Sequence, residues 1–152
     1  MPEKEAVERA RKDEAEGKAP TTQAGEFVHE EIEHVREGKH GARSTKQAIA
    51  IGLSKARRAG VKLPPPKKGK AKTKKSAASA YKAGQTGRKR KPSRTRSRAI
   101  RKALKREGHR AATRKSLARQ ARSAARTRSS ASRSSAAKKA ARTRARRSTK
   151  RK

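Results

Sequence analysis

The sequence contains no cysteine and no tryptophan, and its aromatic residues are one phenylalanine and one tyrosine among 152 residues. Without cysteine, the chain cannot form disulfides, thiolate zinc sites or a cysteine nucleophile. With so few aromatic rings, it lacks the stacking platform on which single-stranded nucleic acids are commonly bound. Charged side chains are therefore the main candidates for binding a partner.

Long apolar runs are missing as well. Hydrophobic residues make up 29% of the chain, well below the usual 45–50% or so. No stretch approaches the roughly 20 apolar residues that a membrane span needs, and the first residues lack the apolar core of a secretory signal. We therefore expect a soluble, cytoplasmic protein with no membrane insertion.

Acidic residues are scarce and unevenly placed. The chain has 48 Lys and Arg against 12 Asp and Glu, a formal net charge of +36. Every acid except Glu107 lies at or before Glu37. An acidic head thus precedes a strongly basic body, an asymmetry that points to an anionic partner. We expect the head to fold back on the body and compete with that partner.

Two segments in the first half have the apolar spacing of amphipathic helices. Residues 24–37 can be capped by Thr21 or Thr22, and the second helix begins at a capping box formed by Ser44 and Gln47. Each carries one apolar stripe at positions i, i+4 and i+7, and the two stripes predict a helical hairpin. The stripes are Val28–Ile32–Val35 and Ile49–Leu53–Ala56.

The rest of the chain has little to bury. Fixing each residue costs roughly 1–2 kcal/mol in backbone entropy, and low hydrophobicity with high net charge favours disorder. The predicted fold is therefore mostly α-helix and disorder, with a small N-terminal helical hairpin and a long disordered basic tail that has nascent helix in free solution and forms more helix on binding. The expected parts are an acidic, mixed-charge helix (1–20), a hairpin module (21–61), an extended Lys/Pro-rich linker (62–92) and an Arg/Ala/Ser-rich tail of low complexity (93–152).

The basic body predicts nucleic-acid binding through phosphates. Duplex DNA carries one negative charge per roughly 1.7 Å of its axis. The many Lys and Arg side chains of the basic body, which have almost no acidic neighbours in the sequence, can neutralise a run of these phosphates. The expected function is non-specific backbone binding by a histone-like, nucleoid-associated protein. The cations expected to contact phosphate are Arg43, Lys46, Lys55, Arg57, Arg58, Lys67, Lys68, Arg88, Lys89, Arg90, Lys91, Arg94, Arg96, Arg98, Arg101, Lys102, Lys105, Arg106, Arg114, Arg119, Arg122, Arg126, Arg128, Arg142, Arg144, Arg146 and Arg147.

Other partners remain open at this point. DNA is the favoured partner, but phosphates do not reveal the sugar, so an RNA- or ribosome-associated polycation is an alternative. Adsorption to an anionic membrane surface or to polyphosphate is a third. The sequence does not indicate an oligomeric state.

One motif resembles a catalytic metal site but lacks its spacing. The histidines of His29-Glu30-Glu31-Ile32-Glu33-His34 are five residues apart, whereas a zinc-protease helix places two histidines at i and i+4. No phosphate-binding glycine loop is present either. We therefore expect a non-enzymatic protein with no catalytic residues, no metal site and no cofactor.

The run Lys46-Gln47-Ala48-Ile49-Ala50-Ile51-Gly52-Leu53-Ser54-Lys55-Ala56 resembles a family of short, uncharacterised basic bacterial proteins. These carry a histidine-containing helix, a Gly/Lys loop and a "KQAIAIALSEA"-like helix. The resemblance covers residues 26–60, and Gly52 and Lys55 depart from the commonest form of the run. It implies a bacterial source and a small basic domain. Beyond residue 66 the composition is similar to the tails of histone-like proteins.

Overall fold

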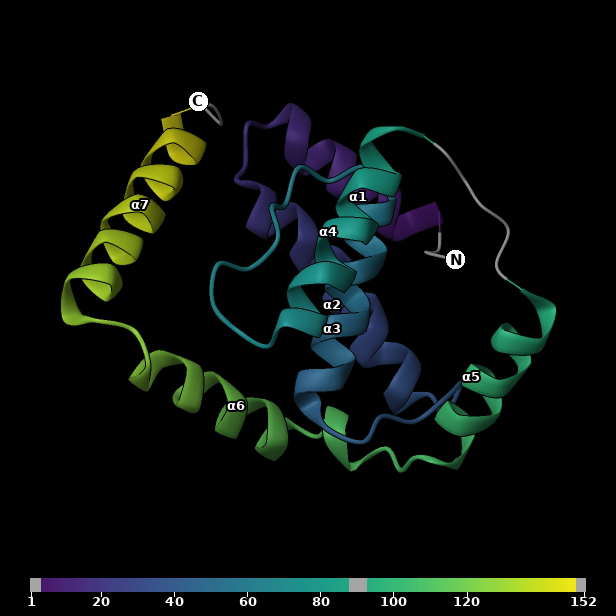
Figure 1. Cartoon of the computed structure of the whole chain (residues 1–152). Coiled ribbons are helices and arrows are strands. Elements are labelled where there is room, and N and C mark those ends of the chain that lie inside the picture. Colours follow the sequence, from purple (N-terminus) through teal and green to yellow (C-terminus); the bar gives the residue numbers. More distant parts are fainter. Residues whose placement is uncertain (1–3, 88–92, 150–152) are drawn as a thin grey trace. The chain divides into compact units, whose positions relative to one another are not determined.

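The computed structural model describes residues 4–87 and 93–149, with side chains as far as residue 146 (Figure 1). All regular structure in these residues is helical, and the chain divides into two compact units, Met1–Ser116 and Leu117–Lys152. The helices are α1 (Lys4–Ala15), α2 (Pro20–Arg36), α3 (Thr45–Arg58), α4 (Ala71–Gln85), α5 (Arg94–Arg106), the 3-10 turn η1 (Arg110–Ala112), α6 (Arg114–Arg126) and α7 (Ser130–Thr149).

The predicted hairpin of α2 and α3 is confirmed and forms the centre of the first unit. Helix α1 packs on α2, so the core extends beyond the hairpin. Phe27 is its largest apolar residue and is 1% exposed. The core cluster is Ala6, Ala10, Ala24, Phe27, Ala56 and Val61, with Val7, Leu53 and Leu63 packed against it. Because most of these residues are small, the helices approach one another closely.

The predicted caps are confirmed in part. The Ser44 hydroxyl accepts a hydrogen bond from the Gln47 amide (3.2 Å), as a capping box requires. The returning bond differs, because the Gln47 side-chain oxygen accepts from the amide of Arg43 at 2.9 Å. At the start of α2 the predicted threonine caps are wrong, since the helix already begins at Pro20, where the missing amide proton costs nothing.

The extended linker predicted over residues 62–92 is wrong for most of its described length. Residues 71–85 form α4, which packs against α3 and buries Ala77 and Ala80. The side-chain amide of Gln85 donates to the carbonyl of Gly60 at 3.1 Å. The alanines of this segment form a small apolar face on α4, which its high lysine content made hard to recognise in the sequence. The segment before α4, with its three prolines, has no helix or strand.

The prediction of a long disordered tail is also wrong, and so is the low-complexity description attached to it. Helices α5, α6 and α7 and the turn η1 occupy nearly all of residues 94–149. The physical reason is local, because Ala, Arg and Lys are among the strongest helix formers. Side-chain caps add to this: Thr113 accepts from the amide of Ser116, and Ser129 accepts from the amide of Ser132.

The acidic head is part of the folded unit. Arg9 pairs with Glu26 on α2 at 2.9 Å, and Ala6 and Ala10 of α1 are buried. Removal of residues 1–37 would therefore delete α1 and all of α2 and destroy the core. The idea that the head competes with an anionic partner stays a prediction that requires substitution of exposed acids.

Candidate nucleic-acid interface

Helix α5 carries a straight row of cations. Arg94, Arg98, Arg101 and Lys105 stand at i, i+4, i+7 and i+11 and are all exposed. At 100° and 1.5 Å per residue, these positions fall within about 60° of arc and extend for about 16 Å along the helix. We call these four residues the α5 row. The helix therefore fixes the spacing of these four positive charges before any partner binds.

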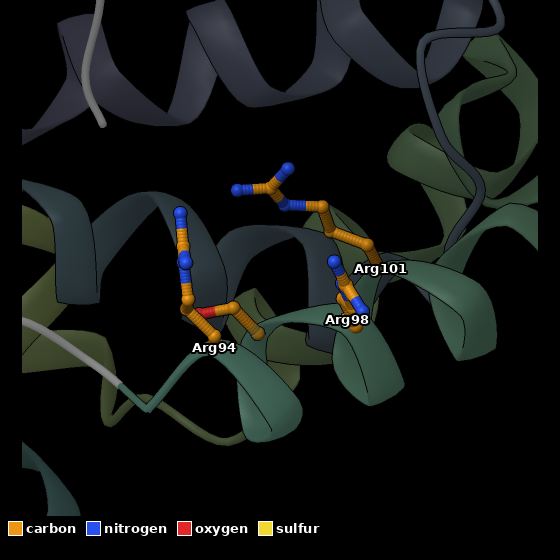
Figure 2. A pocket seen from close by; sticks show the side chains of 4 residues that line it. Arg94, Arg98 and Arg101 are labelled. Atoms are coloured by element: carbon orange, nitrogen blue, oxygen red, sulfur yellow. The ribbon is translucent and has the colours of Figure 1, made fainter.

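The three arginines of the α5 row, together with Ser97, line a shallow hollow of about 300 Å³. Figure 2 shows the side chains of Arg94, Arg98 and Arg101 rising from the same side of α5 toward one open space. A guanidinium group offers a planar fork of N–H donors that matches two phosphate oxygens at once. The hollow is therefore lined by donors suited to an anion.

The electrostatic surroundings favour an external anion. Between Arg94 and Arg146 the sequence contains a single carboxylate, Glu107, which is half-buried at the end of α5. The cations of this stretch cannot all be neutralised by nearby acids. By contrast, nine of the ten described acids at or before Glu37 take part in ion pairs, including Glu33, which pairs with Arg36 at 2.7 Å.

Helix α6 carries a row with the same spacing as the α5 row. Lys115, Arg119, Arg122 and Arg126 stand at i, i+4, i+7 and i+11, and all are exposed. On α7 the exposed Lys139, Arg142 and Arg146 also stand at i, i+3 and i+7, while Arg133, Lys138 and Arg144 lie outside this row. Those that the sequence predicted as contacts are Arg142, Arg144 and Arg146. Rows of aligned, exposed cations thus recur on α5, α6 and α7.

On the hairpin the predicted contacts separate into two groups. Arg43, Lys46 and Arg58 are exposed. Arg57 is 7% exposed and donates to the carbonyls of Leu63 (3.1 Å) and Pro64 (3.3 Å). Its burial lowers the pKa of the guanidinium from its usual value.

Lys55 is also engaged inside the fold. Its ammonium lies 2.8 Å from Oε2 of Glu31 and 3.9 Å from Oε2 of Glu30, and both carboxylates are buried. Lys55 and Arg57 therefore stabilise the hairpin and are not available as free cations for phosphate.

The remaining predicted contacts are exposed or lie outside the description. Arg88, Lys89, Arg90 and Lys91 and the side chain of Arg147 are outside the described residues. The exposed set comprises Lys67, Lys68, Arg96, Lys102, Arg106, Arg114 and Arg128. Further exposed cations that the sequence-based prediction missed include Lys70, Lys72, Lys74, Lys75 and Lys82 of the α4 region and Arg110, Lys115, Arg133, Lys138 and Lys139.

Sequence reasoning also missed a buried polar cluster beneath the hairpin loop. Glu31, His34 and His40 each offer a ligand atom, and these atoms all lie within 4.8 Å of one another. Glu31 is 0% and His34 is 9% exposed. The signal was present, since Glu31 and His34 stand at i and i+3 on one helical face and Gly38, with φ 75°, reverses the chain toward His40.

Comparison with known proteins adds a partial match. Residues 21–68 are similar to a family of unknown function, DUF6496. This span includes α2, α3 and the segment that leads to α4, and it is less than half of the chain. No curated protein and no solved structure matches the chain.

Proposed function

We propose that this protein binds nucleic acid, with duplex DNA favoured, through non-specific contacts to the phosphate backbone. The contacts are made by basic helices that are already formed before binding. The protein acts as a binding protein, not as an enzyme, and needs no cofactor for this activity. The partner we favour is chromosomal DNA of a bacterial nucleoid.

The α5 row carries the proposal. Four exposed cations lie on one side of a single helix, and three of them line one hollow. Phosphates follow one another along a strand of DNA at intervals of about 7 Å or less, so a row about 16 Å long can meet two or three in succession. A preformed row loses less conformational entropy on binding than a disordered tail would.

The proposed contacts are to the backbone and not to base edges. Arg43 and Lys46 are exposed near the start of α3, and backbone contact is the simpler role for them. Phosphate neutralisation also supports RNA as a second candidate, because both nucleic acids carry the same backbone charge. In the described residues no helix is long and apolar enough to cross a membrane.

The test compares two triple variants of equal charge. One is Arg94→Gln, Arg98→Gln and Arg101→Gln on α5. The other is Lys72→Gln, Lys74→Gln and Lys75→Gln on α4, where the three lysines are exposed but lie outside the α5 row. Affinity for duplex DNA, single-stranded DNA and RNA is measured by fluorescence anisotropy at several salt concentrations.

We expect the α5 variant to reduce the slope of log affinity against log salt by about 3, at roughly 0.9 per duplex phosphate contact. The α4 variant should change the slope by less than about 1. Equal losses in the two variants would refute α5 as the contact surface. Wild-type binding that persists in about 1 M salt would refute phosphate neutralisation itself. Tighter binding to RNA than to duplex DNA would favour the second candidate.

A further inference from the structure

We propose that Glu31, His34 and His40 form a binding site for a divalent transition-metal ion of the zinc class. Their ligand atoms lie within 4.8 Å of one another under the hairpin loop. Two imidazoles and one carboxylate are a ligand set that zinc uses where three protein ligands leave one position open. The site is separate from the α5 row and does not depend on the nucleic-acid proposal.

The distance between two of the ligands already fits a metal. Nε2 of His40 lies 3.3 Å from Oε1 of Glu31. Two ligand atoms bound to zinc at about 2.0–2.1 Å in tetrahedral geometry are about 3.3 Å apart. The ring of His34 meets that of His40 edge to face, with centroids 6.1 Å apart. One ring nitrogen of His34 lies within 4.8 Å of the other two ligand atoms and makes the third ligand of the set.

The outer contacts orient the same two ligands. Nδ1 of His40 lies 3.1 Å from the carbonyl oxygen of Gly41. Because a carbonyl can only accept, a donor at Nδ1 satisfies this contact and leaves Nε2, the nitrogen that faces Glu31, as the atom that would bind the metal. A histidine that donates its second N–H to a backbone carbonyl is the usual arrangement around protein metals.

Lys55 has the corresponding role for the carboxylate. Its ammonium lies 2.8 Å from Oε2 of Glu31, on the oxygen that does not face His40. This contact fixes the carboxylate and leaves Oε1 as a single-atom ligand. Both oxygens of Glu31 are buried and lack a hydrogen-bond partner of good geometry among the described residues. Lys55 pairs with Oε2 alone, so a cation bound at Oε1 would stabilise the buried carboxylate further.

The experiment measures Zn²⁺ binding to the untagged, full-length protein by isothermal titration calorimetry with a competing chelator. The variants are His34→Gln, His40→Gln and Glu31→Gln. The control is His29→Gln, which removes a histidine from the same helix whose side chain is 69% exposed and contacts Glu33. Circular dichroism of each variant reports whether the helices persist.

We expect one Zn²⁺ per chain, a higher melting temperature with Zn²⁺, and affinity lowered about tenfold or more by each of the three site variants. The His29 control should bind as the wild type does. X-ray absorption of the zinc complex should show nitrogen and oxygen neighbours at about 2.0–2.1 Å. This last measurement uses wild-type protein, so it stands even if a site variant fails to fold.

Three results would overturn the proposal. They are no saturable 1:1 binding by the wild type, unchanged affinity in a folded His40→Gln variant, and an equal loss in the His29 control. The third would indicate surface histidines as the ligands.

Discussion

Gly52 of α3 lies directly against Val28 of α2: a Cβ atom built on this glycine would come 2.7 Å from the Cα of Val28 and 2.9 Å from the carbonyl oxygen of Phe27. The neighbouring atoms are backbone, so they cannot move aside as a flexible side chain would. This contact sets the spacing of the hairpin and explains why a residue of poor helix propensity stands in the middle of α3.

Gly52→Ala should therefore destabilise the protein. Overpacking costs about 1–3 kcal/mol, and the gain in helix propensity offsets up to about 1 kcal/mol of it. Urea denaturation followed by circular dichroism measures the free energy of unfolding. Gly25→Ala is the control, because Gly25 lies in α2 with no atom within 4 Å of a Cβ. It should stabilise by about 0.5–1 kcal/mol. Equal effects in both variants would contradict the close approach.

Arg57 and Arg58 are adjacent, but substitution of Arg57 should destabilise the protein, whereas substitution of Arg58 should leave its stability nearly unchanged. Arg57→Gln removes donors from two backbone carbonyls in a buried position and should lower the free energy of unfolding by about 1–3 kcal/mol. Arg58→Gln changes an exposed cation and should leave stability within about 0.5 kcal/mol.

The same pair separates structural from binding cations. Salt-dependent DNA binding by the folded Arg57 variant should keep the wild-type slope, because this guanidinium faces the chain. A reduced slope for Arg57→Gln in folded protein would show that the residue contacts phosphate after all.

The sequence allowed the hairpin to be predicted because its apolar stripes and the Ser44 cap are local patterns that are typical of helices. It did not allow α4 or the folded state of α5–α7 to be predicted, since α4 is buried only through Ala77 and Ala80, and α5 and α6 bury no residue. Alanine contributes little apolar area, and its strong helix propensity was given less weight than like-charge repulsion. Repulsion among exposed lysines and arginines is screened by water and salt, whereas helix propensity contributes at every residue of the helix.

The functional residues were predictable to different degrees. Charge alone predicted the α5 row, but only the helix shows that Arg94, Arg98 and Arg101 line one hollow. The spacing of Glu31 and His34 on α2 indicates two members of the buried cluster, but His40 joins them only through the chain reversal after α2. Lys55 was taken for a surface cation because its partners lie on the other helix of the hairpin.

Stability should depend on alkaline pH through Lys18. Its hydrogen bond to Asp13, and then its bond to Glu16 at 2.9 Å, hold the pKa of Lys18 above its usual 10.5. The folded state therefore binds this proton more tightly than the unfolded state does. The stabilisation is fully present below the unfolded pKa and is lost as pH rises through the folded one.

Lys18→Met should thus unfold more easily than the wild type at neutral pH, and the difference should shrink as pH rises above about 10.5. Thermal melts from pH 7 upward measure it. Lys12→Met is the control, since Lys12 is exposed on α1. A difference between wild type and the Lys18 variant that grows with pH would contradict the sign of this effect.

Gly41→Ala tests how the hairpin loop holds the end of α5. The amide of Gly41 donates to the carbonyl of Leu104 at 2.9 Å, and the amide of Ala42 donates to the carbonyl of Gly108 at 3.1 Å. A Cβ on Gly41 would come 1.8 Å from the carbonyl oxygen of Glu107. The substitution should therefore break both bonds, and the amides of residues 41 and 42 should exchange hydrogen at least tenfold faster.

Gly108→Ala is the matched control for that variant, because a Cβ on Gly108 meets no atom within 4 Å. It should leave exchange at residues 41 and 42 unchanged. DNA affinity of Gly41→Ala should stay close to that of the wild type, since the α5 row lies within one helix and does not need the loop to align it. Wild-type exchange rates in Gly41→Ala would refute the contact, and a large loss of affinity would show that α5 binds phosphate only when the loop holds it.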